Sequence, residues 1–454
     1  MLDTEKQNGL TKVLVTGLFL ISVAVMTGGL TDPVNVPKLL LLGVTASVLL
    51  GLLFSFKINL QRLNVIPVVS ILVIFLSFAG IAVVRSNSPI SQNIYGAYGR
   101  NNGFVAYFFL SVLLLASTLL TSRSSQMRIL KSLIYVGYIN LIYCLWVIIF
   151  GDFIPWDNPY GNILGTFGNP NFIGAFFGIF FGVLLAIGLG KDSSKIFKLA
   201  LLFLLPLTLF EIVDSSAIQG RVLAALSVGI VLVFYLYFNF SHKFAFLFTF
   251  ASVILGLFAL GGAFQKGPLT ELIYKTSVSL RGQYWLAAWN TGKENPLSGV
   301  GMDAFGDWYR RSRDVRALEL PGINTVVNTA HNVPLDMFAF GGWPLFIAYL
   351  VVMGFALAAI LRIARRMKTY DAVGVALITA WTCYQVQSII SINQIGLAVW
   401  GWVLSGSVIA YSRYSHLETN QKVSSISTKK RKSAKDSEFK PFSVVSGTIF
   451  GLIG

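Results

Sequence analysis

The sequence predicts an all-α integral membrane protein that crosses the bilayer many times. Hydrophobic residues make up 55% of the 454 residues, charged residues only 12%, and the mean hydropathy is +0.71. Soluble chains carry about 25% charged residues. The apolar residues fall in blocks of roughly twenty, the length that a helix needs to cross the hydrocarbon layer. This composition excludes a cytosolic enzyme, a secreted disulfide scaffold and a disordered chain.

About twelve transmembrane helices are expected where apolar runs end at charged residues or at Gly, Pro and Asn. Their expected limits are 11–29, 37–56, 66–84, 104–121, 132–150, 171–190, 198–214, 220–239, 244–264, 335–361, 372–391 and 397–412. The apolar run of the first helix is too long for a secretory signal, and further spans follow it. We therefore expect it to be an uncleaved helix.

The placement of Lys and Arg predicts that both termini are cytoplasmic. With that orientation, most of the 35 basic residues lie in inner loops and in the C-terminal tail, as expected for a multi-pass protein of the bacterial cytoplasmic membrane. Because topology accounts for the net charge of +16, no nucleic acid partner is needed. Cys144 and Cys383 lie inside apolar segments, so we expect buried packing residues and not a disulfide.

Two parts of the chain are predicted. Residues 1–412 would form the transmembrane domain, including a long outer loop, 265–334, between the ninth and tenth helices. Structureless loops of this length are uncommon and usually functional. Its segment "RGQYWLAAWNTG" predicts a helix that lies on the membrane face or caps a cavity, with one side formed by Tyr284, Ala287, Ala288 and Trp289.

The remaining residues, 413–454, predict a basic cytoplasmic tail. The tail is rich in Ser and Lys ("SSISTKKRKSAKDSEFK"), which favours disorder and contact with anionic membrane lipids. Its last segment, 441–454, is apolar but too short to span the bilayer. No function is assigned to that segment.

Three charged or titratable residues on the outer side are candidates for chemistry, because ionisable groups near the hydrocarbon layer are costly. Arg221 begins the eighth span and faces an outward cavity, unless it only forms a local ion pair with Asp214. Arg281 lies in the long loop. His331 precedes the tenth span and is the one histidine expected outside. An imidazole titrates near ~6.5, so it accepts a proton at neutral pH, although a lone histidine there can also be a polar anchor.

No metal site or cofactor is expected. The outer segments hold no second histidine and no Asp-x-Asp, and Asp303 with Asp307 would make an incomplete site. Gly299 and Gly301 permit a tight turn. No phosphate-binding glycine loop with a lysine is present, so nucleotide hydrolysis is not expected.

Several motifs resemble the O-antigen ligase/polymerase superfamily of bacterial membrane glycosyltransferases. The string from Arg281 to Trp343 carries "RGQYWLAAW", "NPLSGVGMDAF", "AHN" and the start of "GGWPLF", and "GTFGNPNFIGAF" at 165–176 and "GRVLAAL" at 220–226 precede it. The resemblance covers about 90–362. It implies transfer of a glycan from undecaprenyl diphosphate to an acceptor hydroxyl at the outer face of the inner membrane. It also implies that Arg221 and Arg281 bind the diphosphate and that His331 activates the acceptor.

Physical chemistry agrees with that expectation. Undecaprenyl diphosphate is a good leaving group, and fixed arginines can stabilise its developing charge without a metal. A neutral histidine can deprotonate a positioned hydroxyl, and a single displacement would invert the anomeric carbon. Polar and aromatic residues that could line the glycan path, or could instead be interfacial anchors, are Tyr98, Arg100, Asn101, Asn169, Asn171, Tyr284, Trp285 and Asn332.

A transporter of a small anion or solute is the alternative. Transporters concentrate polar residues near the bilayer midplane, whereas this sequence places most of them at the outer helix ends. Gln385, Gln387 and Asn393 are the main exceptions. A flippase would need a continuous cationic groove through the membrane. The sequence leaves open whether the enzyme is a ligase or a polymerase, and whether its acceptor is a glycan, a lipid or a protein.

Overall fold

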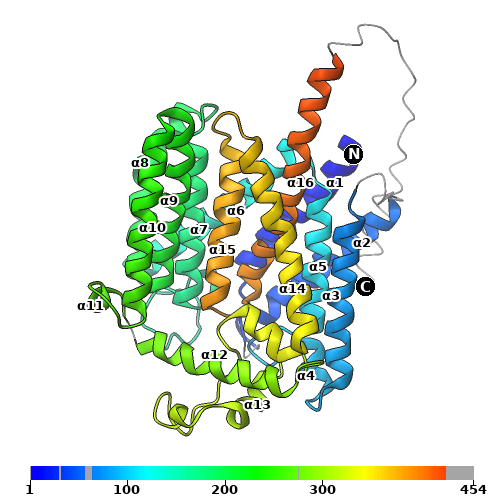
Figure 1. Cartoon of the computed structure of the whole chain (residues 1–454), viewed down its shortest axis with the longest axis vertical. Coiled ribbons are helices and arrows are strands. Elements are labelled where there is room, and N and C mark those ends of the chain that lie inside the picture. The colour runs from blue at the N-terminus through cyan, green and yellow to red at the C-terminus, as the bar shows by residue number, and fades with distance from the viewer. Residues whose placement is uncertain (1, 30–31, 57–63, 275, 426–454) are drawn as a thin grey trace.

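The computed structural model describes residues 2–29, 32–56, 64–274 and 276–425, and this part of the chain is helical and contains no strand (Figure 1). A helix overlaps each expected span, although α1 ends at Val23 and α5 at Thr118, before the expected limits of 29 and 121. These helices are α1 (Thr4–Val23), α2 (Asn35–Ser55), α3 (Ile66–Arg85), α5 (Phe104–Thr118), α6 (Arg123–Phe150), α7 (Pro170–Gly188), α8 (Lys195–Asp214), α9 (Ile218–Asn239), α10 (His242–Ala263), α14 (Val333–Arg366), α15 (Ala372–Ile390) and α16 (Ile395–Ser425).

The chain is a polytopic membrane protein, because 10 of its described helices are long and apolar enough to cross a membrane. Two of the expected spans do not meet that standard. Helix α5 has only 15 residues, and α1 has a polar beginning that includes Glu5 and Lys6. Both pack inside the bundle, α1 against α2 and α6, and α5 against α2 and α16. The expected number of twelve spans therefore stays a prediction.

The centre of the bundle is formed by α7, α15 and α16. The membrane-spanning part of α16 is 100% buried inside the protein, whereas that of α10 is only 6% buried. Helix α10 therefore lies at the periphery, packed against α9 (Figure 1). In the centre, the indole N–H of Trp400 on α16 donates to Ser22 Oγ on α1 at 2.9 Å. This hydrogen bond ties the most buried helix to the first one.

Helix α16 continues to Ser425, past the point where the basic tail is predicted to begin. Residues 426–454 lie outside the described residues, and so does the apolar segment 441–454. The inner-loop residues Lys57 and Arg62 also lie outside them.

A buried lysine stabilises the end of α1. The ammonium of Lys38, a fully buried side chain on α2, donates to the carbonyl oxygens of Ile21 and Ser22 at 2.9 and 2.8 Å. These carbonyls lie in the last turn of α1, where helical partners are missing. A cation also interacts favourably with the negative end of the helix dipole. Lys38 is therefore a helix cap.

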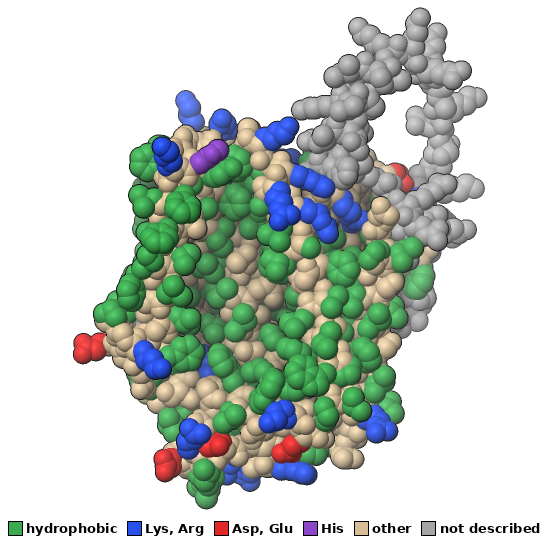
Figure 2. Space-filling view, in the orientation of Figure 1, with side chains coloured by type: hydrophobic (Ala, Val, Ile, Leu, Met, Phe, Trp, Pro, Cys, Tyr) green, Lys and Arg blue, Asp and Glu red, His purple; other side chains and the backbone are tan. Residues whose placement is uncertain are grey.

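The two ends of the bundle differ in charge. Figure 2 shows Lys and Arg gathered at one end, and mixed basic and acidic residues at the opposite end. We call the first the basic end; it includes the starts of α6 and α8. The second, the loop end, carries the remaining short elements: α4 (Ile90–Tyr95), η1 (Gly165–Phe167), α11 (Thr270–Ile273), α12 (Thr276–Glu294), α13 (Phe305–Ser312) and η2 (Val315–Leu318).

Candidate functional site

Helix α12 lies across the loop end of the bundle (Figure 1). It contains the segment that was predicted to be helical. Ala287 and Ala288 are fully buried, and the ring of Trp289 packs against those of Phe338 and Trp343 on α14, with centroid distances of 5.1 and 5.9 Å. The apolar side of α12 therefore attaches the long loop to the start of α14.

A break in α14 fixes the next part of the loop. Gly341 and Gly342 have non-helical backbone angles, which free two carbonyl groups from the helix. The carbonyl of Ala339 accepts from Val300 N at 3.0 Å, and that of Phe340 accepts from Gly301 N at 2.9 Å. In a regular helix the Phe340 carbonyl would need the N–H of residue 344, which is a proline and has none. The loop thus supplies the hydrogen bonds that the break leaves open.

Asp303 joins this loop to the segment before α5. Its buried carboxylate accepts from the backbone N–H groups of Ala97 and Asn102 at 2.8 and 3.2 Å. Burial raises the pKa of Asp303 to about 7, although these N–H groups and the charge of Arg100 act in the opposite direction. Asp303 thereby fixes the turn that carries Arg100.

Asp307 strengthens the same junction. Its carboxylate accepts from Ser88 Oγ at 2.6 Å and from Gln92 Nε2 at 3.2 Å. The sequence offers Asp303 and Asp307 as an incomplete metal site. In the structure, both carboxylates accept hydrogen bonds from groups of the protein itself. Within the described ranges, no group of three or more His, Cys, Asp or Glu residues is arranged to hold a metal ion.

His331 lies in a turn just before α14, with a left-handed φ of 55°. Its N–H donates to Thr329 Oγ1 at 2.9 Å, and its Nδ1 lies 3.3 Å from the carbonyl oxygen of Thr329. The Thr329 hydroxyl donates to Asp336 at 3.1 Å, and Ala330 N donates to the same carboxylate at 2.7 Å. Asp336, buried in the first turn of α14, thus holds the turn that presents the imidazole.

Two arginines act on the imidazole. Burial, together with the charges of Arg100 and Arg281, lowers the pKa of His331 to about 4, although the hydrogen bond to the Thr329 carbonyl acts in the opposite direction. Arg100 donates to Asn328 Oδ1 at 3.2 Å. These three residues come from the turn before α5, from α12 and from the turn before α14. The fold thus gathers two guanidinium groups and one imidazole from segments far apart in sequence.

Arg281 is half-buried and forms no ion pair within 4 Å among the described residues. Burial lowers its pKa. One turn along α12, the ring of Tyr284 lies 5.4 Å from the His331 ring and 6.2 Å from that of Tyr309, measured between centroids. The Trp285 indole N–H and the Tyr309 hydroxyl are buried without a hydrogen-bond partner. The site therefore has polar groups that a ligand could satisfy.

Arg221 lies elsewhere on the loop end. It is exposed in the first turn of α9, and no ion pair with Asp214 forms within 4 Å in the described part of the chain. The start of α9 packs on the start of α7, where Gln219 donates to the carbonyl of Asn171. No hydrogen bond or ion pair links Arg221 to His331 among these residues, and its charge is not among those that act on the imidazole.

Of the other residues predicted to line the glycan path, some cap helices, one is exposed and one is buried. Asn169 caps α7 by accepting from Asn171 N at 2.9 Å, and it donates to the Tyr160 hydroxyl. Asn332 caps α14 by accepting from Leu335 N at 3.0 Å. Both asparagines thus stabilise helix starts. Tyr98 is 65% exposed, and Asn101 is buried with a φ of 58°.

Two of the three polar residues that favour the transporter alternative, Gln385 and Asn393, have side-chain partners, whereas Nε2 of the third, Gln387, is buried without a hydrogen-bond partner among the described residues. Asn393 donates to Asn102 Oδ1 at 3.2 Å and accepts from the Tyr384 hydroxyl at 3.4 Å. Gln385 contacts the sulfur of Met353. Asn393 therefore links the start of α16 to the start of α5.

Sequence reasoning did not single out Thr329 or Asp336, and it gave Asp303 no role at this site. Asp336 had a signal that could have revealed it, because a carboxylate within an apolar run needs a partner. Thr329 and Asp303 lie in loops, where their contacts depend on segments distant in sequence.

Residues 200–350 match the family model described as O-antigen ligase. This match confirms the resemblance to the O-antigen ligase/polymerase superfamily of membrane proteins. It spans α8 to the first half of α14 and contains Arg221, Arg281 and His331. Arg100, Asn169 and Asn171 lie outside it. No curated protein matches the chain.

Proposed function

We propose that this protein transfers a glycan from an undecaprenyl diphosphate carrier to an acceptor hydroxyl at the outer face of the bacterial cytoplasmic membrane. The observation that carries the proposal is the contact of the His331 ring with Tyr284 on α12, at 5.4 Å between centroids, where the charges of Arg100 and Arg281 also act on the imidazole. The O-antigen ligase match over residues 200–350 supports glycan transfer as the reaction. The activity would be that of a ligase or of a polymerase.

The arginines would bind the donor diphosphate. Arg281 has no carboxylate partner among the described residues, and guanidinium groups bind phosphate oxygens in bidentate fashion. As the bond between the anomeric carbon and the phosphate oxygen breaks, the bonding electrons move to the departing diphosphate. Arginines that are already in place stabilise this charge without reorganisation. Arg221 would contact the diphosphate from the α7–α9 side, since it is exposed and unpaired with Asp214.

His331 would act as the general base. Because its pKa is lowered to about 4, the imidazole is neutral at pH 7. The Nδ1 geometry fits donation to the Thr329 carbonyl, which leaves the lone pair of Nε2 free. The acceptor hydroxyl would pass its proton to Nε2 while its oxygen bonds to the anomeric carbon. This single displacement inverts the configuration at that carbon.

The glycan would be held along α12. The unpartnered indole N–H of Trp285 and the Tyr309 hydroxyl offer hydrogen bonds to sugar hydroxyls, and the Tyr284 ring offers a stacking surface. Arg100 would serve the glycan or the diphosphate, given its place beside His331. Asn332, Asn169 and Asn171 would contribute through the helix starts that they form.

The test uses purified protein with an undecaprenyl-diphosphate glycan and a panel of glycan, lipid and protein acceptors, with a chelator present and nucleotide omitted. Release of the carrier diphosphate and formation of the glycosylated product are measured together. We expect His331→Ala to lower turnover by roughly 10²- to 10⁴-fold, the usual contribution of a general base. The matched control is His242→Ala, because His242 is exposed at the basic end.

Equal turnover in the His331 variant and the wild type would overturn the proposal. Uptake of an intact solute into vesicles, without cleavage of any bond, would support the transporter instead. Both outcomes are read from the same preparation.

A further inference from the structure

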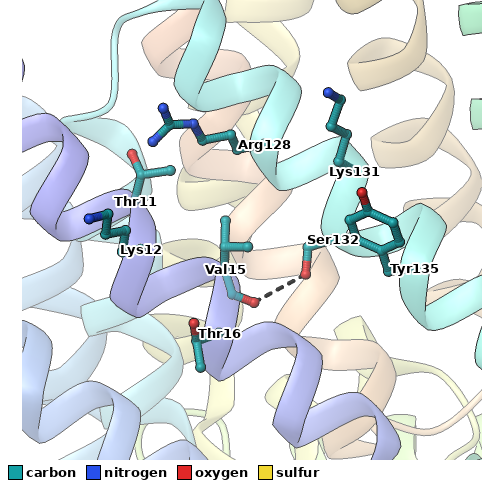
Figure 3. A pocket seen from close by; sticks show the side chains of 8 residues that line it. All are labelled: Thr11, Lys12, Val15, Thr16, Arg128, Lys131, Ser132 and Tyr135. Carbon is teal, nitrogen blue, oxygen red and sulfur yellow. Dashed lines mark hydrogen bonds between the residues drawn. The ribbon is translucent and has the colours of Figure 1, made fainter.

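A cavity of about 240 Å³ lies between α1 and α6, near the basic end. It is separate from the site around His331, which lies at the loop end (Figure 1). Figure 3 shows the side chains that line it, which are Thr11, Lys12, Val15, Thr16, Arg128, Lys131, Ser132 and Tyr135. The glycan transfer proposed above uses none of them.

The two walls of the cavity are held together by hydrogen bonds. Ser132 Oγ on α6 donates to the carbonyl of Val15 on α1 at 3.1 Å. The Thr11 hydroxyl on α1 donates to Ser125 Oγ on α6 at 2.9 Å. Arg128 extends from α6 toward α1 (Figure 3) and donates to Asn8 Oδ1 at 3.1 Å. The cavity is therefore a defined space between two fixed helices.

Three cations and no carboxylate line this space. Lys12 comes from α1, and Arg128 and Lys131 come from α6. None of the three forms an ion pair within 4 Å among the described residues. Like charges on neighbouring helical positions repel one another, so an anion bound between them would relieve that repulsion. Phosphate oxygens suit the guanidinium fork and the two ammonium groups.

Below the cations the surface becomes apolar. Tyr135 lines the cavity and is 57% exposed. Ile139, Ile142 and Trp146 follow it along α6 at helical spacing and are 39%, 69% and 48% exposed. Residues three and four apart share a helix face, so these side chains form a stripe that leads from the cavity toward the middle of the membrane. A phosphate would fit among the cations of the cavity, and an acyl chain attached to it would fit on the apolar stripe.

We propose that this cavity binds the phosphate headgroup of an anionic phospholipid from the leaflet at the basic end. The headgroup phosphate contacts Lys12, Arg128 and Lys131, and one acyl chain lies on the stripe from Tyr135 to Trp146. Basic pockets between transmembrane helices on the cytoplasmic side recognise such headgroups. The bound lipid also joins α1 to α6, and α1 is not among the helices apolar enough to span the membrane by themselves.

The experiment compares lipid binding by three forms of the full chain, delipidated in detergent. They are the wild type, the site variant Lys12→Gln/Arg128→Gln/Lys131→Gln, and the control variant Lys191→Gln/Lys195→Gln/Lys198→Gln. The control removes the same charge from the basic end at exposed positions away from the cavity. Native mass spectrometry counts bound phosphatidylglycerol, and phosphatidylcholine with the same acyl chains serves as the neutral lipid.

We expect one tightly bound phosphatidylglycerol on the wild type and on the control variant. The site variant should bind it about 10- to 100-fold more weakly, in line with the contribution of basic residues near an anionic surface. Equal loss in both variants, or equal binding of phosphatidylcholine by the wild type, would overturn the proposal.

A second set of measurements distinguishes binding of the lipid from binding of free phosphate. Inorganic phosphate is added at millimolar concentration to the wild type with and without phosphatidylglycerol. We expect it neither to displace the lipid nor to bind measurably alone. Phosphate that binds alone and competes would show that the cavity takes a soluble anion, which would overturn the lipid assignment. Neither set of measurements depends on glycan transfer, so failure here leaves the proposed function untouched.

Discussion

The imidazole of His331 is held in its neutral form by its surroundings. Its ordinary pKa of 6.5 falls to about 4, first because burial disfavours the charged ring and then because Arg100 and Arg281 repel it. A folded-state pKa below the unfolded one means that the unfolded chain binds the proton first. The contribution of this residue to stability is therefore lost as the pH falls from 6.5 toward 4.

This shift predicts the pH dependence of the reaction. The acid limb of kcat/KM for the donor should have a pKa near 4 and not near 6.5, since kcat/KM reports the free enzyme. Arg281→Gln should move that limb to higher pH, because a positive charge beside the ring is removed. Initial rates between pH 3.5 and 8, at donor and acceptor concentrations well below their KM values, measure the acid limb of the wild type and of the variant. An acid limb at 6.5 in the wild type would contradict the burial of His331.

Thr329 links Asp336 to His331 and so helps to fix the position of the imidazole ring. Its hydroxyl accepts from His331 N and donates to Asp336. Thr329→Val keeps the shape and removes both hydrogen bonds, so we expect kcat to fall by about 10²-fold, as a misplaced catalytic group does. KM for the donor should change little. Thr329→Ser is the rescue variant, and a Ser variant as impaired as Val would show that the hydroxyl is not what matters.

At the residue scale the sequence predicts which chemistry-bearing residues lie at the outer helix ends, and it says less about which of them meet. His331 was found as the one histidine expected outside. Arg100 was predicted to lie on the glycan path, yet its charge acts on the imidazole itself. Its position depends on Asp303, which lies about two hundred residues away along the chain. No local pattern encodes a contact of that range.

Among the elements, the break in α14 determines where the long loop attaches. Gly342 has a φ of 64°, and a Cβ there would lie 2.3 Å from the carbonyl oxygen of Pro296. Other residues rarely adopt this conformation. The adjacent N–H of Trp343 donates to the same carbonyl at 2.8 Å. This one glycine therefore lets the loop backbone approach the helix.

Gly342→Ala should destabilise the protein by more than about 1 kcal/mol, because Ala cannot adopt a positive φ without strain. Glycan transfer should fall with it, since the same loop carries Asp303. Gly354→Ala is the matched control: Gly354 lies in the same helix with nothing within 4 Å of an added Cβ, so Ala should be neutral or slightly stabilising. Thermal unfolding in detergent compares the two. Equal melting temperatures would contradict a tight contact at Gly342.

The elements themselves were largely predictable. Runs of apolar residues located every long helix, since helices satisfy their own backbone in a bilayer. Helix α12 was also expected from its sequence. The break at Gly341 and Gly342 was not predicted, because both glycines lie inside a continuous run of apolar residues, which indicates a single unbroken helix. The short helices α4 and α13 were missed, because they have only 6 and 8 residues. Phe305 and Tyr309 give α13 a buried face, but two apolar residues are too few to form a periodic pattern in the sequence.

For the whole molecule, the uneven distribution of charge predicts its orientation. We expect the basic end in the cytoplasm and the loop end outside, following the bias of Lys and Arg in short loops. Ile196 at the basic end and Val315 at the loop end are 82% and 73% exposed. The two native cysteines, Cys144 and Cys383, are buried and give little background for thiol labelling.

Thiol labelling of spheroplasts with an impermeant maleimide tests this orientation. The Val315→Cys variant should react in intact spheroplasts, and the Ile196→Cys variant only after permeabilisation. The opposite pattern would place His331 in the cytoplasm and would also refute glycan transfer at the outer face.

Helix α12 is attached unequally at its two ends. Its C-terminal half rests on α14 through Trp289, whereas its N-terminal half follows α10, whose membrane-spanning part is only 6% buried. Arg281 belongs to the loosely supported half, and His331 to the firmly supported side. On the proposed function, the polyprenyl chain of the donor would meet, on that side, a helix with few contacts to the rest of the protein.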